Sequence, residues 1–248
     1  MLLENKVAVV YGAGGPIGGA VSRAFAREGA AVFLAGRTKA KLDRVAEEIH
    51  SNDGSADTAV VDALNEQAVD QYVDGVVEQT GRIDISFNVI GYSDVQKPLP
   101  EISVDDFLQP IMIAMRAQFL TTRAAARHMV KAGSGVILHF GGGGPQTQPG
   151  LGGFKIALDA IEGLRRQWAV ELGPHGIRVL TLKTGGIPET IPDPKEREYI
   201  VDNLLPATLL NRAATLADVG NVAAFVASDQ ASTITSTEVN ISCGAIVD

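Results

Sequence analysis

The chain has 248 residues, 21 Lys+Arg against 29 Asp+Glu, a formal net charge of -8 and 46% hydrophobic residues. This length suits one large α/β domain, and this composition is typical of a folded globular protein. The acidic balance argues against a nucleic-acid partner, and the single cysteine excludes an internal disulfide. An acid within the first six residues and the lack of a long uncharged apolar stretch argue against a signal peptide or membrane span. We therefore expect a cytoplasmic protein.

Short β-branched runs alternate with segments of helical period along the chain. The strands are expected at residues 7–11, 31–35, 57–61, 83–88, 136–140, 177–182 and 238–241. Segments such as 16–28, 38–50 and 65–80 between them carry apolar residues at three- and four-residue spacing. Strands separated by helices run parallel, and coverage on both faces explains why these strands are apolar throughout. The pattern predicts a doubly wound, seven-stranded α/β fold in a single domain, residues 1–248.

The segment 184–211 departs from this alternation. Four prolines punctuate it after the sixth expected strand, at positions 188, 192, 194 and 206. Long irregular insertions at this edge of a sheet often cover a binding site. We therefore expect a lid-like insertion here.

The first expected strand leads into a glycine-rich turn, Gly12-Ala13-Gly14-Gly15-Pro16-Ile17-Gly18, which opens the first helix. In that context glycines let the backbone approach a pyrophosphate, and helix N–H groups receive it. Pro16 contributes no N–H and adds bulk, which makes coenzyme binding itself uncertain. The alternative is a turn that only packs helix against strand.

The turn after the second strand bears on the choice of coenzyme. Gly36 stands where an NAD-binding sheet usually places an acid for the ribose hydroxyls, and Arg37 follows it. A guanidinium matches a 2′-phosphate, so NADP(H) is favoured over NAD(H); the alternative is a solvated basic face. Asp62 and Asn88 end the third and fourth strands, where they could meet an adenine and a ribose or merely cap turns.

With these features the chain resembles the short-chain dehydrogenase/reductase family over its whole length. The glycine turn carries the resemblance together with Val61-Asp62, residues 88–91, residues 170–179 and residues 239–244. The resemblance implies a seven-stranded dinucleotide-binding domain, NAD(P) chemistry on small carbonyls or alcohols, and a homo-oligomer, tetramer or dimer, joined through two long helices. The coenzyme positions expected from the motifs and the resemblance are Gly12, Gly14, Gly15, Ile17, Gly18, Arg37, Asp62, Asn88, Gly91, Gly185 and Ile187.

The family's catalytic asparagine, serine, tyrosine and lysine have no counterparts here. Their positions fall on Ala114, on Gly141 or Gly142, on Phe154 and on Leu158. Carbonyl reduction leaves an alkoxide that needs a positioned proton donor. Phenylalanine has no proton to donate, and Leu158 removes the ammonium that would lower the pKa of a phenol. The family's proton delivery is therefore expected to be lost.

Three side chains near strand ends are candidate substitutes: Lys183, Tyr92 and His139. Lys183 is the preferred replacement cation, although lysines often extend from strand ends to solvent. For Tyr92 a solvent-facing loop position is favoured, and for His139 a hydrogen-bonded core position. The four histidines and the cysteine show no metal-ligand spacing, so no metal is expected.

Two hypotheses follow. The first is an NADP(H)-linked oxidoreductase that acts on an unknown carbonyl or alcohol with non-standard proton delivery. The alternative is a catalytically silent dinucleotide-binding or oligomer-partner protein on the same fold.

Overall fold

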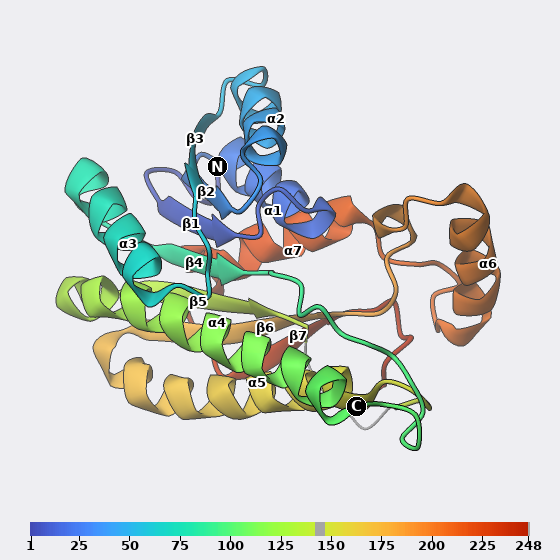
Figure 1. Ribbon diagram of the computed structural model, residues 1–248. Coiled ribbons are helices and arrows are strands. Elements are labelled where there is room, and N and C mark those ends of the chain that lie inside the picture. Colours follow the sequence, from blue (N-terminus) through green and yellow to red (C-terminus); the bar gives the residue numbers. More distant parts are fainter. Residues whose placement is uncertain (142–146, 248) are drawn as a thin grey trace.

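Seven parallel strands form one sheet at the centre of the computed structural model, which describes residues 1–141 and 147–247 (Figure 1). The sheet order is β3-β2-β1-β4-β5-β6-β7, and every neighbouring pair is parallel. The strands are β1 (Val7–Tyr11), β2 (Ala31–Gly36), β3 (Ser55–Val60), β4 (Ile85–Asn88), β5 (Gly135–Phe140), β6 (Ile177–Thr184) and β7 (Thr237–Ile241). The predicted single-domain, doubly wound α/β fold is confirmed.

Helices cover both faces of the sheet. The helices α1 (Pro16–Arg27), α2 (Lys39–His50) and α7 (Leu216–Ala227) pack on one face. The helices α3 (Glu66–Thr80), α4 (Val104–Ala132) and α5 (Gly152–Leu172) pack on the other. Each face has its own apolar core, which is why the strands carry few polar residues. Within the described residues, no helix is long and apolar enough to span a bilayer.

Three strands differ from their expected bounds by two residues: β3 begins two residues earlier, β6 ends two residues later and β4 begins two residues later. At β4 a side chain explains the difference. The Asp84 carboxylate accepts a hydrogen bond from the Val7 backbone N–H at 2.8 Å and another from the Arg82 guanidinium at 2.9 Å. Its side chain therefore ties β4 to β1 before the strand begins. The segment 184–211 contains α6 (Pro194–Leu204), which projects from the loop after β6 (Figure 1).

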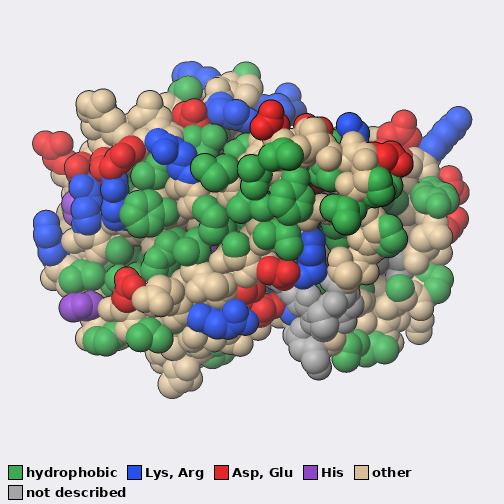
Figure 2. Space-filling model, turned by 60° about the horizontal axis from the view of Figure 1, so that its bottom comes forward, with side chains coloured by type: hydrophobic (Ala, Val, Ile, Leu, Met, Phe, Trp, Pro, Cys, Tyr) green, Lys and Arg blue, Asp and Glu red, His purple; other side chains and the backbone are tan. Residues whose placement is uncertain are grey.

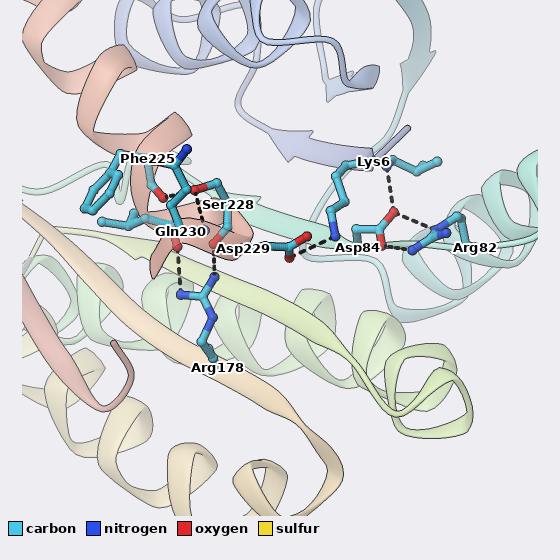
Figure 3. A network of polar contacts seen from close by, with 10 residues as sticks. Lys6, Arg82, Asp84, Arg178, Phe225, Ser228, Asp229 and Gln230 are labelled. Atoms are coloured by element: carbon cyan, nitrogen blue, oxygen red, sulfur yellow. Dashed lines mark hydrogen bonds and ion pairs between the residues drawn. The ribbon is translucent and has the colours of Figure 1, made fainter. Parts of the chain in front are cut away.

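Paired polar groups fasten the edge of the sheet where the strands begin (Figure 3). The Arg178 guanidinium donates to three backbone carbonyls, those of Val226, Ser228 and Ile234, at 2.7, 3.0 and 3.1 Å. Lys6 pairs with Asp229 at 3.0 Å. These contacts join β6 and β1 to the end of α7, so this edge serves stability. Ligands of open parallel sheets bind at the opposite, carboxyl edge.

Candidate functional site

A pocket of about 360 Å³ opens at the carboxyl edge, between the turns that follow β1, β2, β3 and β4. The chain order of the sheet reverses between β1 and β4, which is where open α/β sheets bind their ligands. Six of the expected coenzyme residues line this pocket: Gly12, Gly14, Gly15, Arg37, Asp62 and Gly91. The expected residues Ile17, Gly18, Asn88, Gly185 and Ile187 are not among its lining residues.

The glycine turn runs so close to its neighbours that side chains do not fit. Gly12 has φ +81°, and a Cβ there would lie 2.6 Å from the Val89 carbonyl oxygen. A Cβ at Gly18 would lie 2.3 Å from the carbonyl oxygen of Gly12. The turn therefore packs helix against strand, and it also forms one wall of the pocket.

Helix α1 begins beside this wall at Pro16, the first helical residue. Gly15 precedes it in an extended conformation, without a side-chain cap, and the first turn holds no acid. Such a helix start leaves backbone N–H groups for an anion. Pro16 is exposed and is not among the residues that line the pocket. The bulk of this proline therefore lies outside the pocket.

Two cations stand at the pocket's rim after β2. Arg37 and Lys41 both line the pocket, whereas Lys39 lies outside it and pairs with Asp43 at 2.7 Å. In the part of the chain that the structure describes, neither the Arg37 nor the Lys41 side chain forms an ion pair or hydrogen bond. Strand β2 ends at Gly36, so the pocket offers no carboxylate there. The rim therefore has two cations ready for a negatively charged group.

The polar residues that end β3 and β4 both cap turns. Asp62 accepts a hydrogen bond from the Leu64 N–H at 3.0 Å and also lines the pocket. Asn88 is 2% exposed and donates to the Thr121 hydroxyl at 3.0 Å, while its own oxygen accepts from the Ile90 N–H at 3.3 Å. Asn88 thus holds the turn that frames the pocket.

Several residues that line the pocket were not among the expected coenzyme positions, and Tyr11, Ser93 and Ile113 are examples. The Tyr11 ring is buried edge-on against Tyr72, with ring centroids 6.1 Å apart. Burial raises the pKa of the Tyr11 phenol, and among the described residues its hydroxyl has no hydrogen-bond partner. No motif marks these positions, because they reach the pocket only through the path of the chain.

The positions expected for the family's catalytic residues gather in an apolar cluster between α4, α5 and the turn after β4. Tyr92 and Ala114 are buried in it, and Phe154 and Leu158 pack against them. Gly141 has φ +125°, and a Cβ there would lie 2.8 Å from the Leu158 Cδ2 atom. A serine at position 141 would therefore require a strained backbone and a displaced leucine. Gly142 lies outside the described residues.

Tyr92 is 6% exposed, so the favoured interpretation as a solvent-facing loop tyrosine is wrong. Its hydroxyl donates a long hydrogen bond of 3.5 Å to the Phe140 carbonyl, and its ring centroid lies 6.4 Å from that of Phe154. Burial raises the pKa of this phenol to about 12. At neutral pH the group is therefore protonated and a weak acid.

Lys183 and His139 lie beneath α5 rather than in the pocket. Lys183 is 1% exposed, and its Nζ is 2.5 Å from the Glu238 carboxylate on β7. It does not extend to solvent. His139 is fully buried against Trp168, as a core histidine, and burial with the nearby Arg165 charge lowers its pKa to about 3.

The hydrogen bonds expected for His139 are missing from the described residues, where neither ring nitrogen has a partner. Over the same residues, no group of three or more His, Cys, Asp or Glu side chains could hold a metal ion.

Comparisons with known proteins agree with this geometry. The family model described as enoyl-(acyl carrier protein) reductase matches residues 12–245. A short-chain type dehydrogenase/reductase from Mycobacterium ulcerans superposes with a TM-score of 0.92 at 25% identity, over 99% of this chain and 91% of that one. This chain belongs to the short-chain dehydrogenase/reductase family.

Members of this oxidoreductase family that resemble the chain act on different substrates. A meso-2,3-butanediol dehydrogenase from Serratia marcescens is 32% identical over 99% of this chain and 96% of its own length. A xylitol dehydrogenase solved with NAD⁺ bound has a TM-score of 0.89 at 25% identity, over 98% of this chain and 100% of that one. The family frame is thus present from end to end, and its members bind nicotinamide dinucleotides.

Proposed function

We propose that this chain binds NADP(H) in the pocket at the carboxyl edge, and that it does not catalyse carbonyl reduction by the family's proton transfer. The observation that carries the first part is a pair of cations, Arg37 and Lys41, beside a strand that ends in Gly36. Neither side chain has an ion-pair or hydrogen-bond partner in the described part of the chain. A guanidinium binds a phosphate through two parallel hydrogen bonds, and the missing acid removes the usual partner of an unphosphorylated ribose. The glycine turn and the start of α1 fit a pyrophosphate.

The second part rests on where the candidate proton donors lie. A bound coenzyme supplies a hydride, and the carbonyl oxygen then needs a proton. Tyr92 is buried with a raised pKa, and His139 is buried and neutral. Lys183 is paired with Glu238 beneath α5. Burial thus opposes the use of Tyr92 and His139 as acids at neutral pH, and the Glu238 carboxylate holds the Lys183 ammonium away from the pocket.

Titration with the two coenzymes tests the proposal. We expect NADPH to bind at least about tenfold more tightly than NADH, and Arg37→Ala to remove most of that difference by weakening NADPH alone. Lys39→Ala is the matched control, since Lys39 is paired with Asp43 and lies outside the pocket lining, so both affinities should stay unchanged. Equal affinities in the parent protein would contradict the proposal.

The second candidate function is an NADP(H)-linked oxidoreductase with non-standard proton delivery. Tyr92 favours it, because it places one O–H group inside the apolar cluster at the catalytic positions. Under this hypothesis the Tyr92 proton passes to the carbonyl oxygen of a small substrate. Turnover of NADPH with a panel of ketones and aldehydes, abolished by Tyr92→Phe, would establish it over the silent function.

We further propose that the chain forms a homo-oligomer, a dimer or tetramer, through α4 and α5. Hydrophobic side chains gather on the face in Figure 2, and on these two helices Met112, Phe119, Ile156 and Val170 are 65%, 48%, 45% and 74% exposed. Patches of this kind on a folded protein mark interaction surfaces. Light scattering after gel filtration should give a mass above that of one chain, and Val170→Glu should lower it.

The segment 184–211 is proposed as a lid over the site. No residue from 194 to 203 in α6 is fully buried, so the helix has little packing to hold it in one position. Slower hydrogen exchange in α6 when NADPH is added would support this role.

A further inference from the structure

Tyr92 occupies the centre of the apolar cluster at the catalytic positions. It follows β4 by four residues, and its side chain reaches across to Phe154 on α5 and to the Phe140 carbonyl at the end of β5. The ring is 6% exposed although it belongs to a loop. A loop side chain buried among three other elements fills space that they leave open.

The surrounding residues are adapted to that ring. Ala114 is fully buried and small, so α4 leaves room where a larger side chain would stand. Ala157 adds a second small residue from α5, also fully buried. On the far side Leu158 closes against Gly141, where no Cβ would fit. The small side chains of Ala114 and Ala157 and the absence of a Cβ at Gly141 leave space between α4, α5 and β5. The side chains of Tyr92 and Leu158 fill that space.

One polar residue lines the same volume. Gln118 lies one helical turn after Ala114 and is fully buried. Its amide lies close enough to the phenol to act on the pKa of Tyr92. Neither amide atom makes a hydrogen bond of good geometry within the described part of the chain. A buried amide without a well-aligned partner is rare in folded proteins, so Gln118 keeps hydrogen-bonding capacity for a polar group in this volume beyond its effect on the Tyr92 phenol.

We propose that Tyr92 closes the carbonyl end of the site, and that the volume under its ring is a latent binding site for a small uncharged aromatic alcohol, with Gln118 as the hydrogen-bonding residue. This inference deepens the proposed function, on which it rests: it names the residue that keeps a substrate carbonyl away from Phe154 and Leu158. The ring of Tyr92 is itself such an alcohol, so the site is occupied by a side chain of its own chain. Removal of the ring should leave an apolar cavity with one polar wall.

Phenol is the probe for this cavity. We expect Tyr92→Ala to lower the melting temperature by roughly 10 °C, because the cluster loses a buried aromatic ring. Added phenol should raise the melting temperature of this variant and bind to it in calorimetry with one site per chain. Tyr199→Ala is the matched control, since Tyr199 is 70% exposed on α6. That variant and the parent protein should show neither effect.

The role of Gln118 has its own readout. In the Tyr92→Ala background, phenol should bind about tenfold more tightly than toluene, and Gln118→Leu should remove that preference while toluene still binds. A simple loss of packing would affect both probes alike. Equal affinity for phenol and toluene with Gln118 in place would overturn its assignment.

The proposal is overturned if phenol does not bind to folded Tyr92→Ala, or if that variant melts within about 2 °C of Tyr199→Ala. Should Tyr92→Ala fail to fold, nitration of the native protein by tetranitromethane decides: Tyr199 should be modified and Tyr92 protected. Equal nitration of Tyr92 and Tyr199 would contradict the proposal that Tyr92 is buried and closes the carbonyl end of the site. NADPH titration of the parent protein keeps the two ideas apart, since absence of coenzyme binding counts against the proposed function and leaves the phenol result untouched.

Discussion

The two ends of the candidate site differ in what they are made of. The pocket at the turns after β1 and β2 is shaped by backbone, namely a glycine turn and a helix start. Two cations at its rim have no ion-pair or hydrogen-bond partner among the described residues. The cluster at the catalytic positions is made of side chains, and these are apolar and closed around Tyr92. The first end agrees with the dinucleotide binding of the family, whereas the second is apolar at the positions expected for the family's catalytic residues.

Backbone geometry and side-chain chemistry respond differently to substitution. Backbone geometry is fixed by the fold, so the pocket persists while the sheet and α1 keep their packing. Proton transfer depends on a few side chains, and replacing them leaves the fold intact. In this chain the substitutions fit one another, since Gly141 leaves room for Leu158 and Ala114 leaves room for Tyr92.

The largest expected effect is at the glycine turn. Gly12→Ala places a Cβ 2.6 Å from the Val89 oxygen at φ +81°, so the turn must move. We expect NADPH affinity to fall at least about a hundredfold, measured by coenzyme fluorescence. Gly75→Ala on α3 is the control, because nothing lies within 4 Å of its Cβ. Unchanged NADPH binding in Gly12→Ala would mean that the pocket is not the coenzyme site.

The next effect concerns Lys183. Lys183→Met leaves the Glu238 carboxylate without its buried partner, and we expect about 3 kcal/mol less stability in urea unfolding. NADPH binding should stay the same, because Lys183 does not line the pocket. Lys6→Met, which breaks an ion pair with an 85% exposed Asp229, should cost under about 1 kcal/mol. Loss of NADPH affinity in Lys183→Met would show that this lysine takes part in coenzyme binding.

A smaller effect separates His139 from a proton donor. The folded state keeps His139 neutral down to a pKa of about 3, whereas the unfolded chain protonates it at the ordinary value of 6.5. The unfolded state therefore binds more protons below pH 6.5, and the free energy of unfolding falls as the pH drops from there toward 3. The slope from this group is up to about 1.4 kcal/mol per pH unit. In His139→Phe this part of the slope should vanish; an unchanged slope would show that the buried imidazole is not its source.

No change in activity is expected when only the two α5 positions are replaced. Phe154→Tyr with Leu158→Lys places a phenol and an ammonium on α5 at the positions expected for the family's pair, yet Tyr92 still fills the volume beside them. We expect no reduction of ketones by this double variant. Adding Tyr92→Ala should give the first measurable turnover. Activity in the double variant alone would show that Tyr92 leaves the carbonyl end open.

The order of strands and helices could be predicted from the sequence because it depends on local residue patterns. Apolar β-branched runs and helical spacing identified the strands and the first helices, and the glycine turn was found at the end of β1. The burial of Tyr92 could not be predicted from the sequence. It depends on Ala114 and Phe154, which the fold brings together from distant parts of the chain. Lys183 was misjudged for the same reason: only the pairing of β6 with β7 brings Glu238 beside it.

Turnover of NADPH with carbonyl compounds shows directly whether this chain is catalytically silent. The protein is saturated with NADPH, mixed with a panel of ketones and aldehydes, and followed by the absorbance of the reduced nicotinamide. We expect stoichiometric binding of NADPH and no loss of absorbance beyond that of free NADPH. A carbonyl-dependent loss of absorbance in the parent protein, removed by Tyr92→Phe, would contradict this expectation and make Tyr92 the proton donor of a working reductase.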